Sequence, residues 1–138
     1  MAEPGSPQAA ELPERAAVAN PLLAAFLAWI VPGAGHLMLR KTRRAGLFFA
    51  LVVVALWIGC HLHGNLYTPV AGQPLTFLAT LGCMGLGIPY FVLRYFVGYH
   101  GDFVAAGFEY GTAFILTAGL MNLLLVLDAW DIALGKKD

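Results

Sequence analysis

Four apolar stretches, separated by short polar or glycine-rich segments, dominate the chain between residues 21 and 130. They cover residues 21–39, 45–60, 75–97 and 108–130. A helix rises 1.5 Å per residue, so about 20 apolar residues cross the roughly 30 Å apolar core of a bilayer. The pattern predicts an all-α membrane bundle with transmembrane helices at 45–60, 75–97 and 108–130. A broken apolar helix precedes them, and Pro89 is expected to kink the third stretch.

The first stretch contains the cluster Pro32, Gly33 and Gly35. Proline lacks a backbone N–H and clashes with the preceding turn, and glycine adds backbone freedom, so a helix here must bend or stop. If the helix ends near Val31, it reaches about half-way across the bilayer and forms a re-entrant segment. The sequence therefore predicts three or four crossings, according to whether residues 21–39 cross or re-enter.

The ends of the chain differ in composition from the apolar region. Residues 1–19 are rich in Ala, Pro and Glu and predict a disordered tail without a signal peptide. Asn20 and Pro21 are suited to begin a helix, since Asn can cap it and Pro tolerates its first position. We therefore expect a transmembrane domain over residues 20–134 and a short tail over 135–138.

Composition supports this class of protein. Of the 138 residues, 59% are hydrophobic and 12% are charged, about half the charged fraction of a soluble domain. Net charge is zero and the basic residues gather in one loop, which argues against a nucleic-acid partner. Cys60 and Cys83 lie in separate apolar stretches and are not expected to form a disulfide. The expected partners are the lipid bilayer and either further copies of the chain or another membrane protein.

The basic loop predicts an orientation. Positive loops stay on the cytoplasmic side, which here indicates the inner membrane of a bacterium. With four crossings, residues 61–74 lie outside, residues 98–107 inside, and both chain ends outside. Lys136 and Lys137 argue mildly against this arrangement. The loop contains Arg40, Lys41, Arg43 and Arg44.

Two short patterns carry a resemblance. The run from Pro32 to His36, followed by Leu39, Arg40 and then Arg44-Ala45-Gly46, resembles the P-G-x-G-H…L-x-R…G signature of small uncharacterised bacterial multi-pass membrane proteins. It is more loosely similar to the two-transmembrane-helix domain family, although Arg40 stands where that family has Gly. The segment ending in Asp128-Ala129-Trp130-Asp131 resembles the closing helix of the uncharacterised group. The resemblance implies a fold type and no activity.

A candidate site follows from the expected topology. Irregular backbone inside a membrane is tolerated where it lines a cavity, and transporters bind substrates at such breaks. Polar residues on the same predicted side could converge on the Pro-Gly break. The favoured interpretation is that the break only turns the chain and that His36 sits at the membrane interface, donating to a freed carbonyl or binding a headgroup phosphate. The residues concerned are His36, Arg94, His100, Asp102 and Glu109.

Metal and catalytic chemistry have weaker support. Cys60, His61 and His63 offer metal-ligand atoms, but their spacing is tight and a fourth ligand is missing. His36 and His100 flank apolar stretches rather than lie within them, which disfavours a haem pair. The chain has no Ser-His-Asp set, H-E-x-x-H motif or phosphate loop. We therefore expect neither an enzyme nor a cofactor.

Small residues favour helix packing. Ala79, Cys83 and Gly87 form a stripe on the third stretch, and Gly107 and Gly111 form a G-x-x-x-G. Asn122 lies at bilayer depth in the last stretch, where its amide is expected to bond across to another helix. An interaction or assembly protein is the favoured function. A transporter- or channel-like element that uses the break is the first alternative, and a metal- or redox-linked membrane protein is the second.

Overall fold

A computed structural model describes residues 20–136, which contain helices and no strand. The tails at 1–19 and 137–138 lie outside the described residues. The helices are α1 (Pro21–Ile30), α2 (Ala34–Met38), α3 (Thr42–His61), α4 (Pro74–Met84), α5 (Ile88–Phe91), the π-helix η1 (Val92–Phe96) and α6 (Phe108–Ala133). The predicted all-α class is confirmed.

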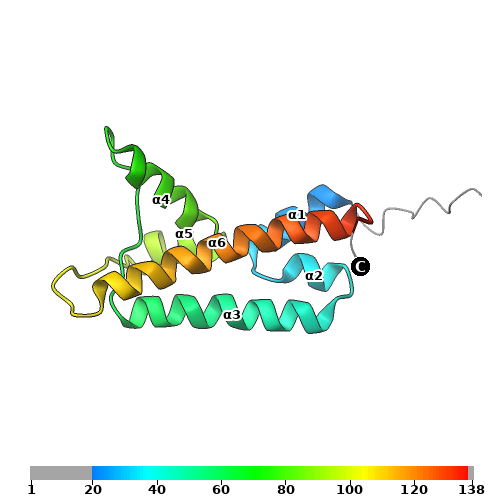
Figure 1. The fold of residues 1–138 in the computed structure, drawn as a ribbon, viewed down its shortest axis with the longest axis horizontal. Helices are drawn as coiled ribbons and strands as arrows, with labels where there is room; N and C mark the ends of the chain where they lie inside the picture. The colour runs from blue at the N-terminus through cyan, green and yellow to red at the C-terminus, as the bar shows by residue number, and fades with distance from the viewer. Residues whose placement is uncertain (1–19, 137–138) are drawn as a thin grey trace, which may run out of the picture.

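Two helices, α3 and α6, are long and apolar enough to cross a membrane. They have 20 and 26 residues and lie side by side along the molecule (Figure 1). They run in opposite directions. The contact of Gly59 and Gly64, near the end of α3, with Gly111, in the first turns of α6, shows this. These two helices contain the predicted stretches 45–60 and 108–130.

The first apolar stretch folds into a hairpin of α1 and α2, which we call the N-terminal hairpin. Asn20 caps α1 by accepting a hydrogen bond of 3.0 Å from the N–H of Leu22, as its position before Pro21 predicts. α1 ends at Ile30, and Gly33 turns the chain with a φ of 82°. α2 then lies back against α1, since a Cβ on Gly35 would be 2.5 Å from the carbonyl oxygen of Ala24.

The third apolar stretch is also broken. Helix α4 ends at Met84, and the segment from Ile88 to Phe96 leaves at an angle of 116° to it. The structure thus has two helical segments at this angle where one kinked helix over residues 75–97 was predicted, and the pair is apolar enough to be either a broken crossing or a re-entrant segment. The chain turns at Gly87, whose φ is 72°, whereas Pro89 lies in the first turn of α5. We call α4, α5 and η1 the middle hairpin.

The segments that precede and follow the middle hairpin come together near the start of α6. The Tyr99 hydroxyl, just beyond η1, donates to the carbonyl of Gly64, which precedes α4. The N–H of Asp102 donates to the carbonyl of His63. Residues 63–65 and 99–102 therefore lie together at what we call the loop end. This contact contradicts the predicted placement of the loops 61–74 and 98–107 on opposite sides.

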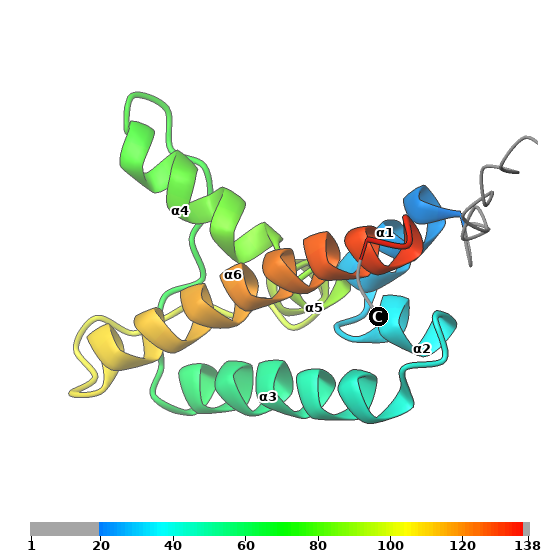
Figure 2. The same cartoon turned by 45° about the vertical axis from the view of Figure 1, so that its right-hand side comes forward.

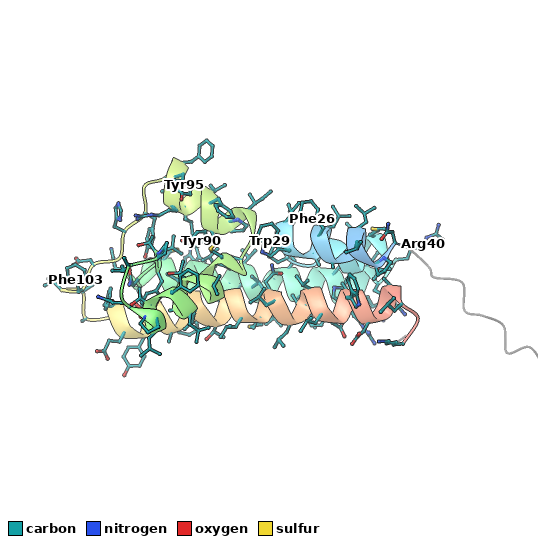
Figure 3. The ribbon with its side chains drawn as sticks, turned by 90° about the horizontal axis from the view of Figure 1, so that it is seen from above. Phe26, Trp29, Arg40, Tyr90, Tyr95 and Phe103 are labelled. Carbon is teal, nitrogen blue, oxygen red and sulfur yellow. The ribbon has the colours of Figure 1, made fainter. Side chains whose placement is uncertain are left out.

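The opposite end of the molecule, the basic end, holds the start of α1, the turn from α2 to α3, and the end of α6. A buried cluster joins these elements: Ala24, Ala28, Leu39, Ala129, Ile132 and Ala133. Figure 3 shows Arg40 at this end and Phe103 at the loop end, with Trp29 and Tyr90 between them. The N-terminal hairpin extends from the basic end, and both hairpins approach the middle of α6 (Figure 2).

Candidate functional site

The tips of the two hairpins meet at the middle of α6, at a place we call the junction. No side chain fits at Gly87, because a Cβ there would overlap the carbonyl oxygen of Trp29 in α1. The Trp29 indole Nε1–H donates to the carbonyl of Met84, at 3.1 Å. The end of α1 and the end of α4 are therefore in direct contact.

Asn122 of α6 binds both tips. Its side-chain Nδ2 donates to the carbonyl of Gly85, at 2.8 Å, and to the carbonyl of Trp29, at 3.3 Å. The residue is fully buried, and its Oδ1 has no hydrogen-bond partner. The last carbonyls of a helix lack partners within the helix. The amide of Asn122 and the indole of Trp29 supply donors to these carbonyls, which lets two helices end inside the molecule.

The predicted bond from Asn122 to another helix is confirmed, and it reaches two hairpins. Trp29 was not predicted to belong to this site. A buried indole N–H usually finds an acceptor, and Trp29 stands three residues before Pro32. That combination is the signal that could have placed Trp29 at a helix end.

A second polar contact joins the N-terminal hairpin to α6 nearer the basic end. His36 of α2 is fully buried, and its Nε2 lies 2.8 Å from Oδ2 of Asp128. The imidazole also meets the ring of Phe48 of α3 edge-on, with centroids 5.2 Å apart. His36 therefore contacts Asp128 inside the bundle, which is neither a headgroup phosphate nor a carbonyl freed by Pro32.

The polar residues expected around the Pro-Gly break do not converge there. Arg94 and His100 pair with each other, with 3.0 Å between Nη1 and Nδ1, on the segment that returns to the loop end. Asp102 lies in the loop at that end, and Glu109 lies in the first turn of α6. Only His36 of this set belongs to the break, because the middle hairpin reverses direction and carries the others away from it.

Arg40 and His63 both occupy turns that end a helix. Arg40 has a φ of 61° after α2, and His63 has a φ of 58° after α3. In both turns the next N–H donates back five residues, from Lys41 to His36 and from Gly64 to Gly59. This is the Schellman arrangement that ends helices. His63 thus has a backbone role in ending α3.

The C-H-x-H cluster does not form a ligand set in the structure. The His61 ring stacks on Trp57, with centroids 5.4 Å apart. Within residues 20–136, no group of three or more His, Cys, Asp or Glu side chains is placed to hold a metal ion. Cys60 and Cys83 are free thiols.

Tyr99 ties the two loops of the loop end together. Its hydroxyl lies 2.9 Å from the carbonyl oxygen of Gly64 and 3.4 Å from that of Cys60. Burial, together with the neighbouring Cys60, raises the pKa of Tyr99 from an ordinary 10.0 to about 12. The protonated hydroxyl is the form that this site holds.

The small residues are used within the chain itself. Gly82 and Gly85 of the middle hairpin lie against Gly119 of α6 so closely that a Cβ on any of them would overlap its neighbours. Gly111 meets Gly59 and Gly64 in the same way. Small residues allow such close backbone approach in membranes. Gly85, Gly111 and Gly119 thus pack the bundle internally, whereas Gly82 and Ala79 also border the surface between α4 and α6.

Apolar grooves lie on the surface near these elements, and we describe one on each hairpin. One, of about 420 Å³, lies between α4 and α6 and is lined by Leu75, Leu78, Ala79, Leu81, Gly82, Leu116, Leu120 and Leu123. The other, of about 350 Å³, lies between the Pro-Gly turn and the start of α3. Gly46 and Thr42 line the second groove, and a Cβ on Gly46 would meet no atom within 4 Å.

Comparison with known proteins places the chain in a family. The model of a family of unknown function, DUF6677, matches residues 23–138. No curated protein and no solved structure matches the chain. The match agrees with the expectation of a small uncharacterised family. The P-G-x-G-H signature and the similarity to the two-transmembrane-helix family stay predictions.

Proposed function

The chain belongs to the family of unknown function DUF6677, and we propose from its own surfaces that it is a non-enzymatic integral membrane protein that self-assembles through helix α4. The observation that carries this proposal is the apolar groove between α4 and α6. α4 leans away from the rest of the bundle (Figure 1). Within the described residues, most of its large apolar side chains are exposed.

Self-complementarity favours a second copy as the partner. α4 exposes Leu75, Phe77, Leu78 and Leu81, and the groove beside it is itself lined mainly by leucine. One surface thus supplies both a ridge and a groove, which a two-fold symmetric contact requires. Two such surfaces would bury each other's leucines by van der Waals packing, the main source of helix association in lipid.

The proposal includes a membrane placement. α3 and α6 cross the bilayer, and the two hairpins re-enter from opposite sides and meet at the junction. The basic end faces the cytoplasm, because Arg40, Lys41, Arg43, Arg44 and Lys136 lie there and Arg94 is the one basic side chain of the described residues nearer the loop end. This arrangement removes the conflict that Lys136 creates for four crossings.

Cysteine cross-linking tests self-assembly. In a Cys60→Ala/Cys83→Ala background, Leu78→Cys should form a disulfide-linked dimer in oxidised membranes, because the groove brings two copies of α4 together. Val54→Cys, exposed on α3, is the matched control and should stay monomeric. Adding Ala79→Leu, which fills the groove, should abolish the Leu78→Cys dimer. A monomer from both cysteines, or an adduct whose mass is not twice that of the chain, contradicts assembly with a second copy.

A transporter- or channel-like role is the second candidate. Two half-length hairpins meeting inside a bundle favour it, because broken helices form the sites of many transporters. The contacts of the junction weigh against it, since the Met84, Gly85 and Trp29 carbonyls are already bound by side-chain donors. Uptake of ions or amino acids into proteoliposomes, compared with protein-free vesicles, would raise this candidate above assembly.

A further inference from the structure

We infer that the groove at the Pro-Gly turn binds one anionic phospholipid, with an acyl chain in the groove and the phosphate at the basic loop. The groove is a separate surface from the one between α4 and α6. Residues 31–34 and Leu37 form one wall, and Thr42, Ala45, Gly46 and Phe49 of α3 form the other. Its lining is almost wholly apolar, which fits a hydrocarbon chain.

The charge at one edge of the groove identifies the headgroup. Thr42 lines the groove, and Lys41 and Arg43 flank it in the chain. Arg40 precedes them on the exposed turn. Neither Lys41 nor Arg43 forms an ion pair with another residue that the structure describes. Cations beside an apolar groove complement an anionic lipid, and basic segments at the membrane surface attract such lipids by about 1 kcal/mol per side chain.

The start of α3 adds to this complementarity. A helix carries partial positive charge at its N-terminus, so acidic residues are favoured there and basic residues are not. The first turn of α3 has no acidic residue and no side-chain cap, and it carries Arg43 and Arg44. A phosphate beside Thr42 would offset this concentration of positive charge and could accept hydrogen bonds from N–H groups at the start of the helix, which have no acceptor in a preceding helical turn.

The groove also has room for an acyl chain. Gly46 faces it, and a side chain there would enter free space. At Gly33 and Gly35, by contrast, a Cβ would lie within 2.6 Å of backbone oxygen atoms. The turn itself is thus tightly packed, while the surface beside Gly46 is left empty in a region otherwise lined by apolar side chains.

Native mass spectrometry of the purified full chain tests the inference. The protein, in detergent, is mixed with equal amounts of phosphatidylglycerol and phosphatidylcholine, and the lipid adducts are counted. We expect one phosphatidylglycerol per chain, retained in preference to phosphatidylcholine. Lys41→Gln/Arg43→Gln should reduce that retention about tenfold or more, since two cations are lost. Arg94→Gln removes one cation near the loop end and should leave retention unchanged.

Groove filling provides the second arm. Gly46→Leu should reduce phosphatidylglycerol retention while the protein stays folded, because its side chain would occupy the place of the acyl chain. Ala113→Leu, also exposed on a long helix, is the control and should have no effect. Equal retention of the two lipids would overturn the inference. So would undiminished retention by Gly46→Leu, or equal binding of soluble glycerol phosphate, which would show that the headgroup alone is recognised.

Discussion

Asn122 is the residue on which the two hairpins depend. The last backbone carbonyls of a helix that ends inside a membrane bundle need hydrogen-bond donors, because each unsatisfied carbonyl costs free energy. Asn122 donates to one carbonyl from each hairpin, and Trp29 donates to a third. A hydrophobic residue of the same size would preserve the volume and remove both Asn122 bonds.

Asn122→Leu should therefore lower the free energy of unfolding by about 1–2 kcal/mol, the range for hydrogen bonds within membranes. Thermal unfolding in detergent, followed by circular dichroism, measures the change. Thr117→Val, at an exposed position of the same helix, should shift the midpoint by much less. Equal midpoints for the two variants would show that the junction bonds are not needed.

His36 and Asp128 should behave as a coupled pair. His36→Leu removes the 2.8 Å contact between the imidazole and the Asp128 carboxylate and should destabilise the protein by about 1–3 kcal/mol. Adding Asp128→Leu should restore part of that loss, and a double-mutant cycle measures the coupling. Additive effects of the two substitutions would argue against a direct interaction.

Tyr99 predicts a stability change at high pH. Its pKa is raised from 10.0 to about 12 in the folded protein, so the fold favours the protonated hydroxyl. That contribution is complete below pH 10 and is lost as pH rises through about 12. Unfolding midpoints measured from pH 9 to 12 should fall more steeply for the wild type than for Tyr99→Phe. Parallel curves would contradict this assignment.

At the residue scale, the sequence predicted identities better than partners. Asn122 stood out because a strongly polar amide lay in a leucine-rich stretch. Its two acceptors were not predictable, because they come from two hairpins that are far apart in the sequence and meet only in the fold. The sequence predicted His36 at the membrane–water interface, because it lies beside the basic loop. Nothing in the sequence shows that α2 turns back into the bundle.

At the scale of elements, glycine decides where the helices break. The Pro-Gly cluster predicted a stop near Val31, and α1 ends one residue earlier at Ile30. In the third stretch the predicted kink at Pro89 is not where the chain turns. Proline suits the first turn of a helix, and Pro89 occupies that place in α5 while Gly87 makes the turn. The tip of the N-terminal hairpin lies directly against this turn, at the carbonyl of Trp29.

The glycines of the N-terminal hairpin give a direct comparison. Gly33→Ala/Gly35→Ala should lower the yield of folded protein, because each Cβ would overlap backbone oxygen and Gly33 has a positive φ. Gly46→Ala meets open space in a helix and should stabilise the protein by about 0.5–1 kcal/mol. Yield and unfolding midpoint after purification measure both. Equal yields for the double variant and the wild type would show that the hairpin does not require close packing.

At the scale of the whole molecule, hydrophobicity predicted the class and failed on the path of the chain. A stretch of 23 apolar residues can cross a bilayer or can enter and return, since length alone permits both. The contacts of residues 97–107 with residues 60–65 favour return. The central claim is therefore that both ends of the middle hairpin lie on one side of the membrane.

Labelling of single cysteines in intact membranes tests that claim most directly. In the Cys60→Ala/Cys83→Ala background, cysteines replace Gln73, Phe103, Arg43 and Lys136, all of which are exposed. A membrane-impermeant maleimide should label Gln73→Cys and Phe103→Cys from one side, and Arg43→Cys and Lys136→Cys from the other. Labelling of Phe103→Cys from the same side as Arg43→Cys would mean that residues 74–96 cross the membrane, and would contradict the account.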